Sequence, residues 1–594
     1  MSKKVKAIKT ESRYKHLVIL GVLIALMFLL RTVFPYRNIF IGNNVIFMGN
    51  DAWYHMRLAE NMLSNFPTPM FFDKYTWFPG GSDIIIPPMM SWIIVAASYI
   101  VSFGQLTVHI VQVVGAWTPP VLAALTMIPV YVIGKELHNK WTGVLAVAIA
   151  GFMPTAFLNR STLGFTDHHV LEVLLYTATI MFLVLAYRKK QIRYYLFAGI
   201  TLGMFHLCWQ GAIYGLFLIC LWFVVQFIFD YWHGLETENL WRGTGCMLAL
   251  STTLHILWVY ELYHRGALPV VYVWLPFVAL LLPLVLPVLA KYLDRKRLIY
   301  ALLAIGAVAI GVTYKLSPDT LGLFAYAISF SHVTRTISET IPLSPQGAFY
   351  EYGINIVLFL GGVTLFIRKK QMLLVGLWSC YVFISVSSQC RWDYYFNITV
   401  AIMSAYFFTT LGMHFIKEVR RGLSLVLCVA LLFLTTPTAL NVVKVPSLMT
   451  QDWYDALYVL KDNTEEPFDT KDAYYQAELE EDAKYGVLSW WDYGHWITQI
   501  SHRVPVANPF QQGAVEAAGF FVDGTEIEGV KYIMVDTAMY TTKYYAMVSF
   551  LDRDPTGITK APDDSHIMKL VRGELDDYVL VYKNSSVMIF EKET

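Results

Sequence analysis

The sequence predicts a polytopic α-helical membrane protein with a mixed α/β domain at its C-terminal end. Of its 594 residues, 56% are hydrophobic and 15% are charged, whereas soluble domains carry about 25% charged residues. Apolar runs long enough to cross a bilayer recur as far as residue 438. After that residue the composition becomes soluble, with acidic runs. We therefore expect a membrane domain at 1–438 and an external domain at 439–594.

The apolar runs predict about thirteen transmembrane helices. They cover residues 16–34, 108–133, 143–158, 170–186, 194–209, 212–229, 245–261, 270–290, 299–315, 353–367, 371–388, 395–415 and 422–438. Residues 84–104 are also apolar, but counting them as a span would invert every later loop. We therefore expect this segment to form a helix that lies along the membrane surface or re-enters it.

Clusters of basic residues predict the orientation. They lie at 3–15, 135–140, 188–193, 295–297, 368–370 and 417–421. All of them fall on one side of the predicted helices, and basic loops stay cytoplasmic. We expect a multi-pass protein of the cell membrane whose N-terminus is cytoplasmic. The loops 35–107 and 316–352 and the domain 439–594 are then external.

Short strand-like runs indicate the class of the external domain. They cover 485–489, 532–535, 578–582 and 587–591, with helical patterns between them. Strands that alternate with helices favour a mixed α/β fold.

Ionisable side chains gather at the predicted outer ends of the helices. They include Asp51, Asp167, His169 and Glu339. Singly, Asp51 and Asp167 could be helix N-caps, and Glu339 a solvated loop residue. Together they form an oxygen-rich set that suits Mg²⁺, and a histidine shifts the preference toward Mn²⁺ or a later metal. Ionisable groups at membrane depth are costly and usually functional.

The heptapeptide 490–496, WWDYGHW, places three tryptophans beside an aspartate in the external domain. Asp492 can accept a hydrogen bond, and an indole N–H of Trp490 or Trp491 can donate one. Such a pair complements one Ser or Thr hydroxyl, and a site built for a hydroxyl rejects substrates that lack it. Alternatively, the tryptophans form the domain core and Asp492 caps a helix that starts near Tyr493.

WWDYG resembles the signature of the catalytic subunit of oligosaccharyltransferase, the membrane enzyme that makes asparagine-linked glycans. Other motifs resemble those of its archaeal form in the same order. They are Gly49-Asn50-Asp51, Asp167-His168-His169, Thr336-Ile337-Ser338-Glu339, Arg391 before Tyr394-Tyr395, and 536–547, which fits D-x-x-M-x-x-x-K-x-x-x-M. The resemblance covers almost the whole chain and implies a membrane domain of the GT-C type with an external mixed domain.

The resemblance also implies an activity. An oligosaccharide would pass, with inversion, from a dolichol-phosphate-type lipid carrier to the asparagine amide of Asn-x-Ser/Thr in an acceptor polypeptide. The family-implied catalytic pair is Asp51 and Glu339. The partners would be the lipid-linked oligosaccharide, the acceptor and membrane lipids, with no nucleic acid, and one subunit would suffice.

The expected binding residues fall into three groups. Asp51, Asp167 and His169 would bind Mn²⁺ or Mg²⁺. Arg391, His168, Arg160 and Trp209 would hold the lipid-linked donor. Trp490, Trp491, Asp492, Met539, Lys543 and Met547 would bind the acceptor sequon. The spacing of the last three predicts that they share one face of a helix, where a methionine could contact the threonine methyl group.

Two other functions compete with this hypothesis. A transporter would explain the spans, but it would place ionisable groups near the bilayer midplane and has no need of a hydroxyl-binding signature. Another lipid-sugar-dependent transferase, such as a protein O-mannosyltransferase, would share the acidic first loop but has no evident use for WWDYG.

Overall fold

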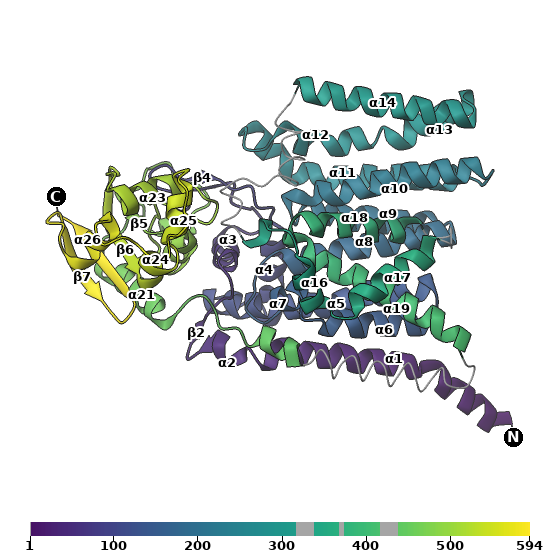
Figure 1. Ribbon diagram of the computed structural model, residues 1–594, viewed down its shortest axis with the longest axis horizontal. Helices are drawn as coiled ribbons and strands as arrows, with labels where there is room; N and C mark the ends of the chain where they lie inside the picture. Colours follow the sequence, from purple (N-terminus) through teal and green to yellow (C-terminus); the bar gives the residue numbers. More distant parts are fainter. Residues whose placement is uncertain (1, 317–337, 368–372, 416–436, 594) are drawn as a thin grey trace.

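The computed structural model describes residues 2–316, 338–367, 373–415 and 437–593. A helical body lies at one end of the long axis and an outer domain, residues 451–593, at the other (Figure 1). The body's longer helices run side by side along this axis (Figure 1). They are α1 (Ser2–Val33), α5 (Val108–Leu137), α6 (Lys140–Phe152), α8 (His169–Lys189), α9 (Ile192–His206), α10 (Ile213–Trp232), α11 (Glu238–His264), α12 (Val270–Ala279), α13 (Leu282–Tyr292), α14 (Arg295–Leu316), α17 (Asn355–Ile367), α18 (Leu373–Ser388) and α19 (Asp393–Phe415).

Shorter elements connect these helices. They are α2 (Tyr36–Ile39), the strand pair β1 (Phe40–Ile41) and β2 (Asn44–Val45), α3 (Asp51–Asn65), the pair β3 (Phe72–Asp73) and β4 (Ser82–Asp83), α4 (Met89–Val101), α7 (Ala156–Arg160), α16 (Pro345–Tyr352) and the 3₁₀ turns η1 (Gln210–Ala212), η3 (Ser338–Thr340) and η4 (Cys390–Trp392).

Within the described residues, six helices are long and apolar enough to cross a membrane. A seventh span results if α16 and α17, which are bent by 97°, are counted together. Helices α4, α6 and α18 are apolar but shorter. The predicted multi-span helical body is therefore confirmed, and the number of about thirteen spans stays a prediction. The predicted span 422–438 lies almost wholly outside the described residues.

Small residues allow two of these helices to approach closely. Gly199 and Gly203 of α9 lie against Met247 and Leu254 of α11. A Cβ added at Gly199 would lie 2.7 Å from the Met247 carbonyl oxygen, which no side chain can tolerate. Such close backbone approach is the usual way in which helices pack in membranes.

The outer domain contains a four-stranded sheet in the order β5-β6-β8-β7. Its strands are β5 (Gly486–Leu488), β6 (Val530–Asp536), β7 (Tyr578–Lys583) and β8 (Val587–Lys592). The pair β5–β6 is parallel and the other pairs are antiparallel. All four predicted strands are thereby confirmed. The surrounding helices are α21 (Gln451–Asn463), η5 (Ala473–Tyr475), η6 (Trp491–Tyr493), α22 (Gly494–Trp496), the π-helix η7 (Ile497–Ser501), α23 (Ala514–Asp523), α24 (Thr537–Thr541), α25 (Tyr544–Phe550) and α26 (His566–Arg572).

Helix α3 joins the two parts and lies between them in Figure 1. Its buried Glu60 accepts hydrogen bonds from Gln112 of α5 (2.7 Å) and from Gln499 of η7 (2.9 Å). Arg57 pairs with Asp73 at 3.1 Å and also donates to the Tyr474 carbonyl of the outer domain. Because each buried polar group needs its partner, this network fixes α3 between the body and the outer domain.

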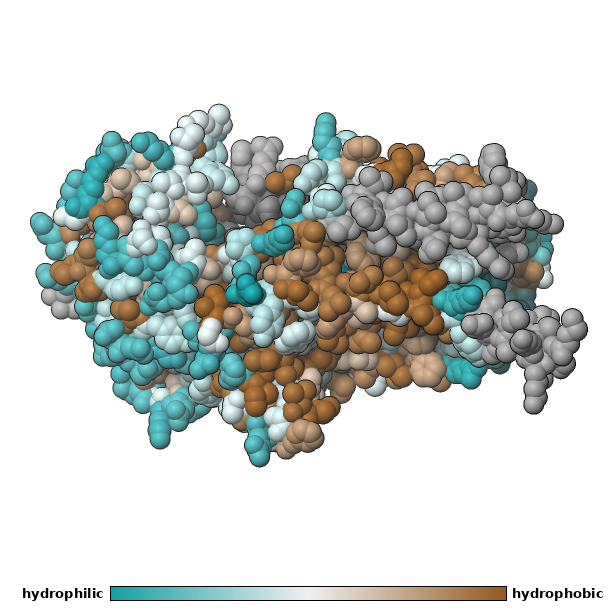
Figure 2. Space-filling view, turned by 90° about the horizontal axis from the view of Figure 1, so that it is seen from below, coloured by the Kyte–Doolittle hydropathy of each residue, from teal (hydrophilic) through white to brown (hydrophobic). Residues whose placement is uncertain are grey.

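The surface divides in the same way. Figure 2 shows hydrophobic side chains concentrated over the helical body and hydrophilic ones over the outer domain. The exposed apolar residues of the body include Leu257 and Leu303, each 66% exposed. Apolar side chains exposed in this density suit a lipid environment rather than water.

Candidate active site

Asp51 is the first residue of α3, at the end of the body that faces the outer domain. The preceding Gly49 has φ +77°, a left-handed conformation in which a side chain would be strained, and it lies against the Phe165 ring. Met48 donates from its backbone to the Gly164 carbonyl at 2.8 Å. This turn places Asp51 beside the segment that carries Asp167. Helix α3 already includes Asp51, and Asn50 occupies its N-cap position, so the interpretation of Asp51 as the N-cap is wrong.

Asp167 is the centre of a cluster of histidines. Its Oδ1 lies 3.2 Å from His55 Nε2 and 2.6 Å from His168 Nδ1, and its Oδ2 lies 3.1 Å from His169 Nε2. The two ring nitrogens of His55 and His168 are themselves 3.0 Å apart. Facing nitrogens repel unless they share a proton or a cation, so the donor set fits a divalent metal ion.

The ligand atoms of His55, Asp167 and His168 lie within 4.8 Å of one another, and so do those of His168, His169 and Glu172. Glu172 accepts from His169 Nδ1 at 3.0 Å and orients that ring. His55 and Glu172 were not among the residues predicted from the sequence. The signal for His55 was its position four residues after Asp51, which puts both side chains on one helix face.

The carboxylates of the site influence one another. The Asp51 side chain is 55% exposed, yet the surrounding protein removes much of its solvation, and with Asp167 and Glu339 nearby the pKa of Asp51 rises to about 6. Burial alone would raise the pKa of Asp167, but His169 and His168 hold it well below its usual value. The three predicted carboxylates, Asp51, Asp167 and Glu339, come from distant segments but lie close enough for their charges to affect one another.

Glu339 in η3 forms an ion pair with Arg160 of α7. Burial would raise the pKa of Glu339, but Arg160, His169 and Arg391 lower it to about 2. Residues 336 and 337 of its motif lie outside the described residues. Glu339 thus stays ionised. Its partner Arg160 is a residue expected from the sequence to hold the lipid donor.

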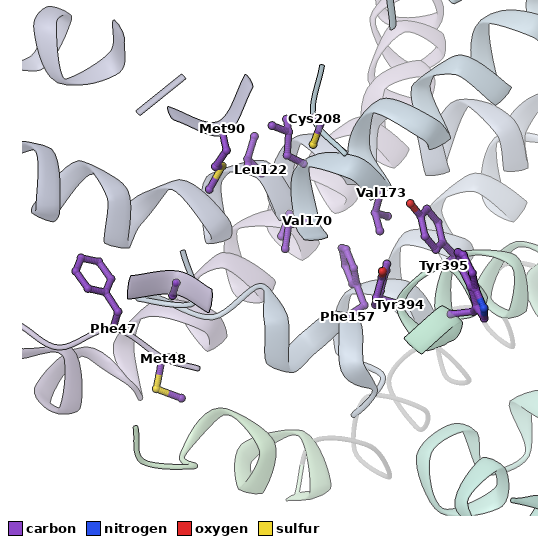
Figure 3. Packing of buried hydrophobic residues seen from close by; sticks show 14 of the residues in the cluster. Phe47, Met48, Met90, Leu122, Phe157, Val170, Val173, Cys208, Tyr394 and Tyr395 are labelled. Atoms are coloured by element: carbon purple, nitrogen blue, oxygen red, sulfur yellow. The ribbon is translucent and has the colours of Figure 1, made fainter. Parts of the chain in front are cut away.

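A cavity of about 480 Å³ adjoins these residues. Glu339 and Arg391 line it together with Gln210 and the segments 82–86 and 510–512. Its size is that of a small-molecule site. Trp209 precedes Gln210 and η1 in the chain and packs edge-on against Trp392 at 5.9 Å. Phe157, Val170 and Tyr394 belong to one buried cluster (Figure 3), and the Tyr394 ring lies 5.0 Å from that of His169.

Some residues of the WWDYG segment pack in the core of the outer domain, and others belong to the candidate site. Trp490 is 1% exposed and packs edge-on against Phe550, as the core interpretation expected. Asp492 makes no capping bond. Instead its Oδ2 accepts from Lys543 Nζ at 2.6 Å. The Trp491 indole Nε1 is buried and has no hydrogen-bond partner within the described ranges, so Trp491 carries a free donor.

The predicted single helix over 536–547 is wrong. The structure has two short helices, α24 and α25, separated at Thr542 and Lys543. The hydroxyl of Thr541 bonds back to the Thr537 carbonyl at 2.7 Å, and the Lys543 N–H bonds to the Ala538 carbonyl. Consecutive threonines favour such back-bonding and weaken a helix.

The break between α24 and α25 nevertheless leaves Lys543 in hydrogen-bonding contact with Asp492. Asp536 caps α24 by accepting from the Met539 N–H, and it also accepts from Trp453 and Tyr493. Met539 and Met547 are fully buried in the domain. Contact of either with a substrate methyl group stays a prediction.

Comparison with known proteins shows the family to which the chain belongs. The family model described as oligosaccharyl transferase STT3, N-terminal, matches residues 22–443, and the AglB core domain model matches 450–551. This chain belongs to the STT3 oligosaccharyltransferase family. It is therefore a glycosyltransferase, and the transporter and O-mannosyltransferase hypotheses are excluded.

This STT3 family member is similar to several archaeal proteins. It is 26% identical to dolichyl-phosphooligosaccharide-protein glycotransferase 3 of Archaeoglobus fulgidus, over 91% of this chain and 71% of the relative. It is 24% identical to dolichyl-monophosphooligosaccharide-protein glycotransferase AglB of Haloferax volcanii, over 90% and 66%. The solved AglB of Archaeoglobus fulgidus, in complex with an inhibitory peptide and a dolichol-phosphate, has the same fold, with TM-score 0.82 at 23% identity, over 96% and 80%.

Proposed function

We propose that this chain transfers an oligosaccharide from a dolichol-phosphate-type lipid to the side-chain amide of asparagine in Asn-x-Ser/Thr, with inversion at the anomeric carbon. Solved structures of an Archaeoglobus fulgidus oligosaccharyltransferase include one with a tethered peptide that contains an NVT sequon and one with an inhibitory peptide and a dolichol-phosphate. Those complexes concern the relatives, and they support the same two substrates here. We further propose that the outer domain is external and the N-terminus cytoplasmic, as the basic loops indicate.

The observation that carries the proposal is the pairing of Trp491 with Asp492. The indole N–H of Trp491 is buried and has no partner among the described residues, and a buried polar group is costly to leave unpaired. Beside it stands a carboxylate whose position Lys543 fixes. The hydroxyl of Ser or Thr in the sequon can accept from Trp491 and donate to Asp492, so one group satisfies both. A substrate without the hydroxyl would leave both unpaired, which costs about 1–3 kcal/mol for each group.

The asparagine amide needs activation because its nitrogen lone pair is delocalised, with a rotation barrier of about 18–20 kcal/mol. Asp51 and Glu339 can each accept a hydrogen bond from the NH₂ group and weaken this conjugation. Both carboxylates belong to one electrostatic cluster. Glu339 is held by Arg160, so accepting from the amide requires it to share or exchange this partner.

We propose that Asp51, Asp167 and His169 bind Mn²⁺ or Mg²⁺, with His55 and His168 within reach of the same position. When bound, the cation would stabilise negative charge on the departing lipid phosphate. Several imidazole donors favour Mn²⁺ over Mg²⁺. A relative has been solved in complex with Zn and sulfate, which supports a divalent-cation site in this fold.

For the donor, we propose that Arg391, His168, Arg160 and Trp209 hold the lipid phosphate and first sugar. Arg391 and Glu339 line one cavity, so phosphate and acceptor amide would meet there. The Arg391 Nε is buried without a hydrogen-bond partner in the described part of the chain. A planar guanidinium suits phosphate because it donates two parallel hydrogen bonds.

The test uses the purified full chain in detergent with a fluorescent Asn-x-Thr peptide and an archaeal extract of dolichol-linked oligosaccharides. Transfer should add glycan mass to this peptide in the presence of Mn²⁺. Matched Gln-x-Thr and Asn-x-Ala peptides should stay unmodified, as should every peptide after chelation. Modification of the Gln-x-Thr peptide, or of none, would contradict the proposal.

A further inference from the structure

His495, immediately after WWDYG, occupies the junction between the outer domain and α3. Its side chain is 1% exposed. The ring stacks on Tyr54 of α3 with centroids 4.7 Å apart, and the Phe510 ring meets it edge-on at 4.8 Å. Tyr54 donates to Asp73 at 3.2 Å, and Asp73 is fixed by Arg57. The platform under the histidine is therefore rigid.

Neither ring nitrogen of His495 has a hydrogen-bond partner among the residues described. Leaving a buried polar group unsatisfied is costly, so such groups in native proteins call for an explanation. A ring needed only for packing between Tyr54 and Phe510 would be better supplied by phenylalanine, which has no polar atoms to bury. The histidine nitrogens therefore point to a partner that is positioned close by.

The carboxylate nearest to the ring is Asp51, whose Oδ1 lies 3.9 Å from His495 Nε2. The Asp51 side chain is 55% exposed and makes no hydrogen bond that the described residues provide. It is thus the mobile member of the pair, and a movement of about 1 Å brings the two atoms to hydrogen-bonding distance.

We infer that His495 is a positioning residue whose Nε2–H donates to the Asp51 carboxylate and fixes its orientation during transfer. The inference rests on the role proposed for Asp51. One carboxylate oxygen would accept from His495, which leaves the other for the acceptor amide or for the cation. Carboxylates in metal sites are commonly held by a second residue in this way.

This contact would join two parts of the site that the sequence separates. Asp51 belongs to the helical body, and His495 follows the segment that binds the sequon hydroxyl. A catalytic group must be held within about 0.5 Å of its productive position. A hydrogen bond from the outer domain to Asp51 would set that position relative to Trp491 and Asp492, and therefore relative to the bound asparagine.

Two substitutions separate hydrogen bonding from packing. His495→Phe keeps the ring on Tyr54 but removes the donor, whereas His495→Gln removes the ring but keeps an N–H near the Nε2 position. His566→Phe is the matched control, because His566 also packs edge-on against a phenylalanine, Phe520, in the same domain. The measurements are kcat and KM for an Asn-x-Thr peptide, the Mn²⁺ dissociation constant by electron paramagnetic resonance without substrates, and the unfolding temperature.

We expect His495→Phe to lower kcat and weaken Mn²⁺ binding by about 10–100-fold. The peptide KM should stay within about twofold, because the interaction acts on the reacting end of the site. His495→Gln should recover most of both losses, and His566→Phe should match the parent. Parental values for His495→Phe would overturn the inference. So would equal losses in both His495 variants or failure of both to fold, since these results indicate a packing role.

Asp51→Asn distinguishes this inference from the proposed function. If Asp51→Asn transfers as well as the parent, the role proposed for Asp51 fails, and the inference fails with it. If Asp51→Asn is inactive while His495→Phe is fully active, the proposed function stands and the inference alone is wrong.

Discussion

Lys543 Nζ lies 2.6 Å from Asp492 Oδ2 and 4.2 Å from the centroid of the Tyr493 ring. The lysine comes from the break between α24 and α25, and the aspartate from η6. The ammonium group of Lys543 therefore donates to the Asp492 carboxylate of WWDYG and also packs on the ring of Tyr493, the next residue. Both side chains are partly buried, so water screens this pair less than a surface ion pair.

Removing this ammonium should weaken recognition of the sequon. Lys543→Met keeps the length of the side chain but releases Asp492, and loss of about 1.4 kcal/mol would raise the peptide KM about tenfold. Initial rates at varied Asn-x-Thr concentration measure this. Lys531→Met is the control, because Lys531 pairs with Glu465 on the surface, at 2.8 Å. Equal peptide KM values for both variants would refute the role of Lys543.

The ligand set of the cation can be decided by comparing two histidines. His55 lies 3.2 Å and His169 3.1 Å from Asp167, on opposite carboxylate oxygens. We expect Asp167→Asn and His169→Asn each to weaken Mn²⁺ binding at least about tenfold. If His55→Asn weakens it while His169→Asn does not, the ligands are His55, Asp167 and His168 instead. Paramagnetic resonance titration measures the constants, with Asp523→Asn on the outer surface as control.

Arg391 should act on the lipid donor alone. Arg391→Ala is expected to raise the KM for the lipid-linked oligosaccharide at least about tenfold, since a charge-assisted hydrogen bond contributes about 1.5–3 kcal/mol. Arg391→Lys should recover only part of this, because an ammonium cannot donate in a bidentate fork. The peptide KM should not change. A donor KM that is insensitive to both substitutions would remove Arg391 from the donor site.

Glu339→Gln tests the activation of the amide. It keeps the shape of the side chain but exchanges a charged acceptor for a neutral group, so transfer should fall at least about 100-fold. Peptide binding, measured by fluorescence anisotropy, should stay close to that of the parent. Lost binding with a normal rate per bound peptide would instead make Glu339 a docking residue.

Acidification should destabilise the outer domain through His502. Its neutral ring stacks on Tyr474 at 3.6 Å and accepts from Lys461. Burial, with Lys461 and Arg57 nearby, holds the pKa of His502 well below its usual value. The unfolded chain therefore binds one more proton below about pH 6.5, and stability falls by up to about 1.4 kcal/mol for each pH unit below it.

The control for this effect is His502→Asn, because asparagine tolerates the φ of +52° at this position. Unfolding temperatures between pH 7.5 and 5 should fall more steeply in the parent than in the variant. Parallel curves would show that His502 does not titrate on unfolding.

Patterns of neighbouring residues in the sequence were sufficient to predict much of the fold. Apolar runs predicted the helices, short strand-like runs predicted strands such as 532–535, and their shared place at the outer ends of the helices, with the family resemblance, pointed to Asp51 and Asp167. These features depend on neighbouring residues, because burial of a helix or strand face repeats with the period of the backbone. The break within 536–547 escaped prediction, since helical spacing alone does not reveal threonine hydroxyls that bond back to the chain.

Only the tertiary structure decided which polar groups meet. Glu339 pairs with Arg160, His55 faces His168, and His495 approaches Asp51. Each pair joins segments more than a hundred residues apart, and its distance depends on how α3, α7 and the outer domain pack together. No short-range periodicity encodes such a distance. The sequence by itself therefore determined the chemical types present in the site, and packing determined which of them act on one another.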